Sequence, residues 1–151
     1  NYNLLIDVNL KGTLNCINYL QKKMKTRKNS HIAIVSSPVG YRGLPTASAY
    51  GMTKAGLINL AESLFFDFKK IGIKISVINP GFIKSQSTNM NKFPMPFIKT
   101  ANFAAEKIFQ GLTKSNRFEI YFPFFFLKLL KFGRVLPYPI YFYLIKKITG
   151  L

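Results

Sequence analysis

The sequence is poor in the side chains from which disulfides and most metal sites are built. It has one cysteine, Cys16, and one histidine, His31, among 151 residues. A single thiol excludes an internal disulfide framework and suits a reducing, cytoplasmic compartment. The apolar neighbours of Cys16 predict a packed helix residue, and the position of His31 before a strand predicts a surface residue. Since neither has cysteine or carboxylate residues clustered around it, we expect no metal.

Negative charge is equally scarce. Five acidic residues stand against 22 basic ones, so the formal net charge is +17. Such an excess can attract nucleic acid or an anionic membrane surface. However, 18 of the basic residues are lysines that are spread along the chain, and no helix-turn-helix, zinc-module or RNA-binding signature accompanies them. We therefore expect no nucleic-acid partner.

A hydrophobic run long enough to cross a bilayer is also missing. Residues 123–151 are rich in aromatic and basic side chains, but their apolar runs are short compared with the ~20 residues of a spanning helix. Three arrangements stay open for this extension. It can lie peripherally on the inner face of a membrane, close a substrate pocket as a pair of helices, or contact another subunit.

What the chain does contain is an alternation of helical and strand patterns. Apolar residues at three- and four-residue spacing indicate helices, and short β-branched runs indicate buried strands. Helices are expected at 3–26, 47–70 and 101–114, and strands at 31–36, 73–78 and 118–122. This order predicts an α/β fold with a parallel sheet in residues 1–122, followed by an aromatic helical tail in residues 123–151.

Ser37, Tyr50 and Lys54 form the most informative motif, a serine at the end of a predicted strand, twelve residues, and then Tyr-x-x-x-Lys. Tyr50 and Lys54 are four residues apart at the start of a predicted helix, so both side chains leave the same face. A free tyrosine titrates near ~10, and a close ammonium favours the phenolate. We expect Lys54 to lower the pKa of Tyr50, and Ser37 to hold a substrate oxygen against the phenol.

This motif resembles the catalytic core of the classical short-chain dehydrogenases/reductases. Two further segments are similar to segments of that family. One precedes the motif and the other follows it, in the same order as in the family. Residues 7–12 resemble its Val-Asn-x-x-Gly segment, whose asparagine corresponds to Asn9. Residues 75–85 resemble its strand and Pro-Gly-x-x-x-Thr loop, with Ser85 in place of the threonine. Together the three segments extend the resemblance from about residue 3 to residue 85.

The resemblance implies a Rossmann-like, doubly wound sheet in an oxidoreductase. Such an enzyme transfers hydride between NAD or NADP and a carbonyl compound or secondary alcohol. Tyr50 would exchange the proton, Lys54 would also hold the nicotinamide ribose, Ser37 would orient the carbonyl, and Asn9 would support a water-linked proton path. The residues implied in cofactor binding are Tyr50, Lys54, Pro80, Gly81, Ile83 and Ser85.

The sequence departs from the family at its beginning. It lacks the Gly-rich phosphate turn and the first strands, so we expect a partial sheet. On this interpretation the chain is the C-terminal part of a longer enzyme, is inactive alone, and does not reveal whether the cofactor is NAD or NADP. The alternative is a truncated, non-catalytic product that at most binds a membrane surface or a partner subunit.

The resemblance also implies partners. The family's dimers pack helices equivalent to those near 3–26 and 47–70 as a four-helix bundle, so we expect a homo-oligomer. The loop at 84–99 covers the substrate in that family. Its apolar residues are either candidate pocket walls or side chains that a surface loop packs against the core, namely Met90, Phe93, Met95 and Phe97. With the apolar tail, they favour a hydrophobic, lipid-like carbonyl substrate.

Overall fold

The sheet consists of three parallel strands, and the computed structural model describes them with the rest of residues 2–89 and 95–150. β1 (His31–Val35), β2 (Lys74–Pro80) and β3 (Glu119–Phe122) lie side by side in that order. Ile78 of the central strand β2 lies beside Ile120 of the neighbouring strand β3. The five residues between the ends of β2 are all buried, as is typical of a strand covered on both faces.

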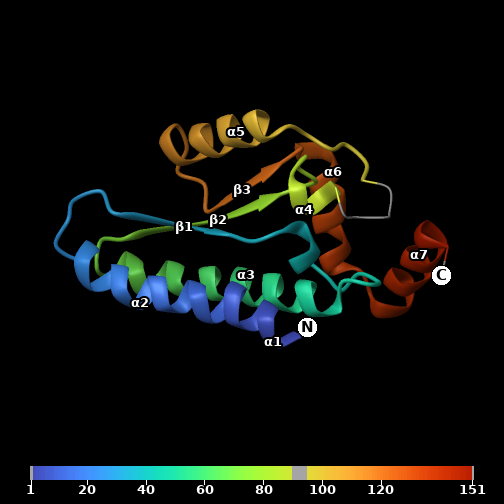
Figure 1. Cartoon of the computed structure of the whole chain (residues 1–151), viewed down its shortest axis with the longest axis horizontal. Helices are drawn as coiled ribbons and strands as arrows, with labels where there is room; N and C mark the ends of the chain where they lie inside the picture. Colours follow the sequence, from blue (N-terminus) through green and yellow to red (C-terminus); the bar gives the residue numbers. More distant parts are fainter. Residues whose placement is uncertain (1, 90–94, 151) are drawn as a thin grey trace.

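Helices cover both faces of this sheet (Figure 1). On one face lie α3 (Ser48–Lys69) and a continuous helical run. That run comprises α1 (Tyr2–Leu5), the π-helical turn η1 (Ile6–Lys11) and α2 (Gly12–Met24). On the other face lies α5 (Ala101–Thr113). Helices on both faces of a parallel sheet confirm the predicted α/β, partial Rossmann-like architecture.

Each face of the sheet has its own apolar core. The larger core lies between the sheet and α3, and its buried members are Ile17, Ile32, Ile34, Tyr41, Leu57, Ile58, Ala61, Phe68, Ile73, Ile75 and Val77. The smaller core, on the α5 side, contains Ile78, Ala104, Ile120 and Phe122. Full burial of one large aliphatic side chain contributes about 1.5–3 kcal/mol, so these clusters hold the helices against the strands.

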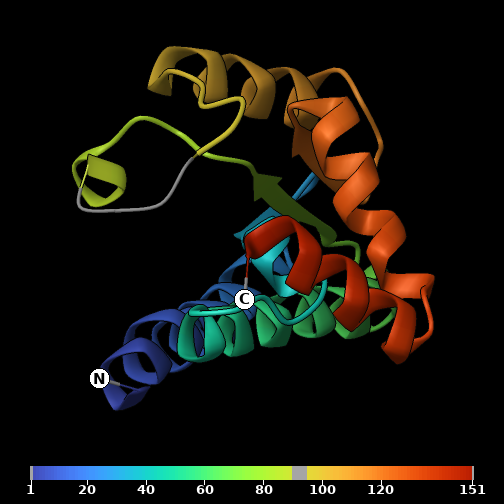
Figure 2. The same ribbon diagram turned by 90° about the vertical axis from the view of Figure 1, so that its right-hand side faces the viewer.

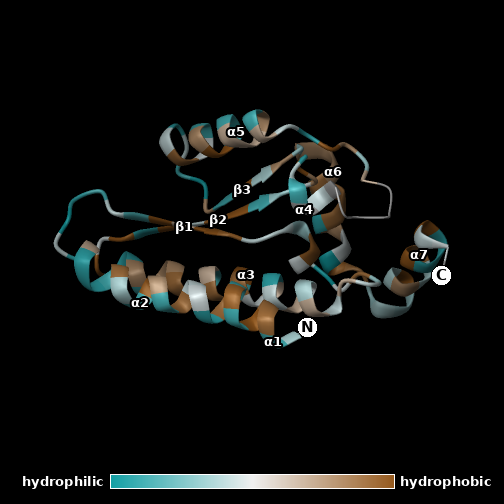
Figure 3. Ribbon diagram, viewed as in Figure 1, coloured by the Kyte–Doolittle hydropathy of each residue, from teal (hydrophilic) through white to brown (hydrophobic). Residues whose placement is uncertain are grey.

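The C-terminal extension is helical, as predicted. α6 (Phe124–Phe132) follows β3 directly, and the 3₁₀ turn η3 (Gly133–Val135) leads into α7 (Tyr138–Thr149). Leu127 is fully buried and attaches α6 to the rest of the chain, whereas Phe125 is 85% exposed. Brown, white and teal residues alternate along both α6 and α7 (Figure 3). The domain boundary at residue 122 stays a prediction.

All six predicted elements are present, and their ends agree with the structure to within two residues.

The predictions about the exposure of Cys16 and His31 are wrong. Cys16 is exposed because its neighbour Ile17 occupies the buried face of α2, and adjacent residues on a helix point about 100° apart. His31 is half-buried, with its Nε2 2.9 Å from the hydroxyl of Ser76. Burial, followed by the positive charge of Lys74, lowers the pKa of His31.

Candidate active site

Two serines follow β1 and make different contacts. The N–H of Ser36 extends the pairing with β2, and its hydroxyl donates a hydrogen bond to the carbonyl oxygen of Lys54 at 2.7 Å. Ser37 begins a 3₁₀ turn, η2 (Pro38–Gly40), and its hydroxyl accepts from the N–H of Val39 at 3.4 Å. Ser36 therefore ties the strand to α3, while the hydroxyl of Ser37 lies at the carboxyl edge of the sheet, where ligands bind in open α/β folds.

Tyr50 lies in the first turn of α3, and its side chain is 40% exposed. Partial burial raises the pKa of the Tyr50 phenol above its usual value of 10.0, and the interaction with the Ser37 side chain acts in the opposite direction. Lys54 is not among the groups that shift the pKa of Tyr50 here, and the expectation that it lowers this pKa stays a prediction. The phenol carries its proton at neutral pH, so it can act as a proton donor.

Lys54 follows Tyr50 by one helical turn on the same face, as the spacing predicted. Its Nζ lies 5.6 Å from the centroid of the Tyr50 ring and donates a hydrogen bond to the carbonyl oxygen of Val35 at 3.2 Å. Burial lowers the pKa of Lys54 below 10.5. An ammonium group has three N–H donors, so Lys54 can serve a ligand with paired hydroxyls while it keeps its bond to β1.

Asn9 reaches this site through an intermediate residue. Its Nδ2 donates to the hydroxyl of Thr53 at 3.0 Å, and that fully buried hydroxyl donates to the carbonyl oxygen of Tyr50 at 2.9 Å. Asn9 belongs to η1, whose π-helical pairing is visible where the N–H of Gly12 bonds to the carbonyl oxygen of Asp7. Single π turns in α-helices occur frequently at functional sites. The hydroxyl of Thr53 thus links Asn9 to the backbone of Tyr50.

The turn η2 and helix α3 pack against each other at backbone distance. A Cβ atom added to Gly40 would lie 2.6 Å from the carbonyl carbon of Lys54 and 2.8 Å from the nitrogen of Ala55. Real Cβ atoms do not approach backbone atoms so closely. The absence of a side chain at Gly40 therefore sets how near the Ser37 turn comes to Lys54.

The segment after β2 begins at the same edge of the sheet. Pro80 ends the strand, and the N–H of Gly81 bonds to the carbonyl oxygen of Phe122 at 2.8 Å. Ile83 then pairs with Lys99 in an isolated bridge, which joins the two ends of the loop between them. Ser85 is exposed beside α4 (Gln86–Asn89), and its N–H donates to the hydroxyl of Thr88 at 2.8 Å.

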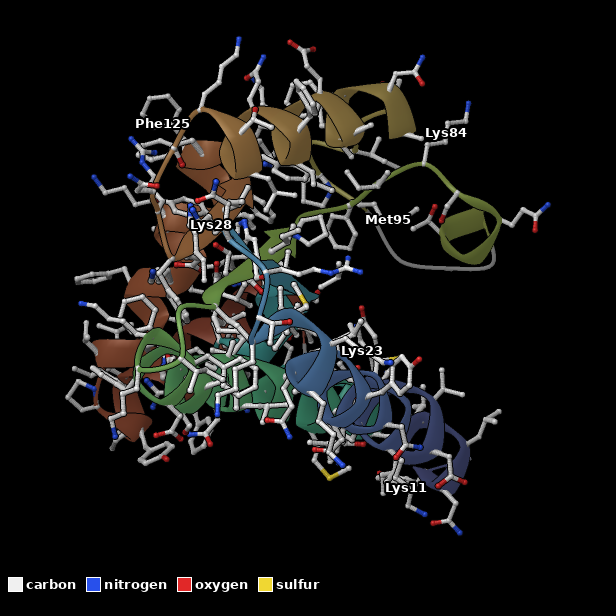
Figure 4. The ribbon with its side chains drawn as sticks, turned by 90° about the vertical axis from the view of Figure 1, so that its left-hand side faces the viewer. Lys11, Lys23, Lys28, Lys84, Met95 and Phe125 are labelled. Carbon is white, nitrogen blue, oxygen red and sulfur yellow. The ribbon has the colours of Figure 1, made fainter. Side chains whose placement is uncertain are left out.

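The candidate pocket walls in this loop are only partly described. Met90 and Phe93 lie outside the described residues. Met95 is half-buried, and Figure 4 labels it beside the loop that carries α4. Phe97 is 62% exposed, and its ring centroid lies 5.3 Å from that of Phe126 in α6. The loop therefore contacts the C-terminal extension, while the role of these residues toward a substrate stays a prediction.

Sequence reasoning missed a polar cluster around Glu119. This carboxylate accepts hydrogen bonds from Tyr41 at 2.5 Å and from Asn79 at 2.7 Å, and it pairs with Lys131 of α6. Burial alone would raise the pKa of Glu119, but the hydrogen bonds from Lys131, Tyr41 and Asn79 hold the pKa below its usual 4.5. One signal could have indicated this cluster: Glu119 is a carboxylate in a predicted buried strand, in a chain with only five acidic residues.

Comparisons with known proteins agree with this geometry. The sequence profile of the short chain dehydrogenase family matches residues 1–95. An uncharacterized oxidoreductase of Myxococcus xanthus is 35% identical over 137 residues, which are 91% of this chain and 54% of that protein. The 3-oxoacyl-(acyl-carrier-protein) reductase of Staphylococcus aureus is 39% identical over 85 residues, 56% of this chain and 35% of that enzyme.

Solved structures show the same fold. A short chain dehydrogenase from Burkholderia cenocepacia, in complex with NADP, superposes with a TM-score of 0.77 at 19% identity, covering 88% of this chain and 55% of that one. A short-chain dehydrogenase from Sphingobium yanoikuyae, in complex with NADPH, gives a TM-score of 0.71 at 16% identity over 80% of this chain and 48% of that one.

The chain belongs to the short-chain dehydrogenase family of oxidoreductases. It spans about half the length of the Myxococcus relative and about a third of the Staphylococcus reductase. Within the described residues, no group of three or more His, Cys, Asp and Glu side chains is arranged to hold a metal ion.

Proposed function

We propose that the protein containing this chain is an NAD- or NADP-dependent oxidoreductase that interconverts a carbonyl compound and the corresponding secondary alcohol. The observation that carries the proposal is the arrangement of Ser37, Tyr50 and Lys54 at one edge of the sheet. The Ser37 side chain influences the pKa of the Tyr50 phenol, and the Lys54 ammonium lies 5.6 Å from the centroid of the Tyr50 ring. A hydroxyl, a phenol and an ammonium can hold an oxygen, exchange its proton and bind a cofactor.

Each residue has a distinct part in this mechanism. A nicotinamide held at this site would supply or accept the hydride. Tyr50 would exchange the proton with the substrate oxygen, which the hydroxyl of Ser37 would orient against it. Lys54 would hold the ribose, and the three donors of its ammonium fit that role. Asn9 holds the first turn of α3 through Thr53, and its part in a water-linked proton path belongs to the same proposal.

The loop after β2 is the proposed contact for the nicotinamide. Pro80 ends the strand next to β1 and Gly81, Ile83 and Ser85 follow it, so this segment starts from the same carboxyl edge as Ser37. Ligands of doubly wound folds bind outside the carboxyl ends of the strands. The solved relatives in complex with NADP and NADPH support a nicotinamide cofactor here.

We propose a hydrophobic carbonyl compound, such as a 3-oxoacyl thioester, as the substrate class. The Staphylococcus relative is a 3-oxoacyl-(acyl-carrier-protein) reductase, and the extension near the site is rich in apolar side chains. In the full-length protein, we expect NADPH or NADH to be oxidised when such a substrate is added, as followed by nicotinamide absorbance. No turnover of oxoacyl thioesters, ketones, aldehydes or alcohols with either cofactor would favour the non-catalytic alternative.

We also propose that the extension contacts the surface of an anionic membrane. Along α6, Phe125, Leu129 and Phe132 are 85%, 70% and 60% exposed, at spacings of four and three residues that place them on one face. Residues 120–151 contain five basic side chains and no acidic one. Exposed aromatic residues beside lysine and arginine suit a peripheral position among anionic headgroups. Within the described residues, no helix is long and apolar enough to cross a bilayer.

Sedimentation with anionic lipid vesicles tests this second proposal. We expect the full-length protein to bind at low salt and to be released at high salt, because each basic residue near the surface contributes about 1 kcal/mol. Replacing Phe125, Leu129 and Phe132 by serine should abolish binding. The matched control replaces Tyr19, Phe66 and Phe109, which are 66%, 68% and 62% exposed elsewhere. Equal loss in both variants, or no binding of the wild type at low salt, would reject the membrane contact.

Self-association through the helices near 3–26 and 47–70 stays a prediction. It is supported by apolar side chains that these helices expose, including Leu4, Val8, Tyr19 and Phe66.

A further inference from the structure

Arg42 follows the Ser37 turn and makes four contacts with the C-terminal extension. Its Nη1 donates hydrogen bonds to the carbonyl oxygens of Gly133 at 2.5 Å and Leu136 at 2.6 Å. Its guanidinium carbon also lies 4.7 Å from the ring centroid of Tyr138 and 4.1 Å from that of Tyr141. One side chain therefore holds both the carbonyl groups of the η3 region and the first turns of α7.

A residue of the extension, Tyr141, also contacts the loop that carries Arg42. Tyr141 is buried, and its hydroxyl donates a hydrogen bond to the carbonyl oxygen of Gly43 at 2.7 Å. The ring of Tyr141 also packs against Gly133, where an added Cβ would lie 3.5 Å from the ring. Arg42 and Tyr141 thus interlock, each reaching the backbone of the other's segment. Figure 2 shows α7 in front of the loop that joins η2 to α3.

Tyr41, the neighbour of Arg42, is linked through Glu119 to α6, the other helix of the extension. Its hydroxyl donates to Glu119, which in turn pairs with Lys131 of α6. A cavity of about 440 Å³ lies between the loop and the extension, and it is lined by Tyr41, Arg42, Arg134, Val135, Leu136, Pro137 and Tyr138.

We infer that Arg42 is a positioning residue, which holds residues 133–149 against the loop that carries Ser37 and leads into Tyr50. Through this contact the extension forms a wall for the apolar part of the substrate. The second statement rests on the proposed function, while the first rests on contacts alone. Arginine suits the position because its planar group can donate to two carbonyl oxygens and stack on two rings, which a lysine ammonium does not reproduce.

Amide hydrogen exchange of the full-length protein tests the contact directly. We expect Arg42→Lys to speed exchange in residues 133–149 about tenfold or more, because it keeps the charge but loses the planar contacts. Tyr141→Phe, which loses one hydrogen bond and keeps the ring, should speed exchange about threefold. Arg27→Lys makes the same chemical change at an exposed turn at the opposite end of the molecule and should have no effect (Figure 1). Unchanged exchange in Arg42→Lys would overturn the inference.

Steady-state kinetics test the role in the substrate site. We expect Arg42→Lys to raise KM for a long-chain 3-oxoacyl thioester about tenfold, with a much smaller rise for a short-chain one and little change in kcat. Faster hydrogen exchange with equal changes in KM for both chain lengths would support the anchoring role of Arg42. It would reject the statement that the extension forms a wall for the apolar part of the substrate. If the wild-type protein reduces no carbonyl compound, the proposed function fails, and hydrogen exchange still decides whether Arg42 holds the extension.

Discussion

Tyr50→Phe in the full-length protein is expected to lower kcat by about 10³-fold, within the range that general acid–base catalysis contributes. The substitution removes the phenolic oxygen and keeps the ring, so helix α3 and the position of Lys54 stay unchanged. Because Lys54 is proposed to hold the ribose, the dissociation constant for the nicotinamide cofactor should stay within about twofold of the wild type. Steady-state turnover and cofactor titration measure the two quantities separately.

The matched control for this prediction is Tyr19→Phe. Tyr19 is 66% exposed on α2, so loss of its hydroxyl should change neither kcat nor cofactor binding. Turnover close to that of the wild type in Tyr50→Phe would remove Tyr50 from the chemistry. A large loss of cofactor affinity would instead show that the ring or the hydroxyl contributes to binding.

Gly40→Ala should lower the free energy of unfolding by about 3 kcal/mol, at the upper end of the usual cost of overpacking. The added methyl group would meet the backbone of Lys54 and Ala55 at 2.6 and 2.8 Å, and backbone atoms in a helix cannot rotate away as a side chain can. Relief requires η2 to move away from α3, which would separate Ser37 from Tyr50. We therefore expect turnover to fall even at temperatures where the variant is folded. Chemical denaturation and steady-state kinetics check the two effects.

Gly43→Ala is the control for this second prediction. Gly43 lies three residues later in the same loop, and an added Cβ would meet nothing within 4 Å. Its free energy of unfolding should change by less than about 0.5 kcal/mol, as for ordinary surface substitutions. If Gly40→Ala were as stable and as active as Gly43→Ala, the spacing between the Ser37 turn and α3 would not depend on Gly40.

The placement of the candidate catalytic residues could be predicted from the sequence because their geometry is local. Tyr50 and Lys54 share a face of one helix, and Ser37 follows the strand before it. Their electrostatics could not be predicted in the same way. Burial raises the pKa of Tyr50, and Lys54 directs one N–H to Val35; both depend on how α3 packs on β1.

The contacts of Arg42 and the π-helical turn could not be predicted, for two different reasons. Arg42 meets Gly133, which is 91 residues away, and no periodic pattern in the sequence reports a contact at that distance. The turn at Ile6–Lys11 differs from an α-helix only in which carbonyl oxygen each N–H selects, and the apolar spacing does not encode that choice. The polar cluster around Glu119 could have been predicted, since a carboxylate placed in a buried strand requires hydrogen-bonding or charged partners.

The free side of β1 determines how the site can be extended. In the described part of the chain this strand pairs with β2 alone, and Val35 at its end is 51% exposed. A strand edge offers unpaired N–H and C=O groups to a further strand. A parallel strand added there would lie about 4.8 Å from β1 and would end beside Ser37, since parallel strands run in one direction. The loop following that strand would then form the wall of the site opposite the segment after β2.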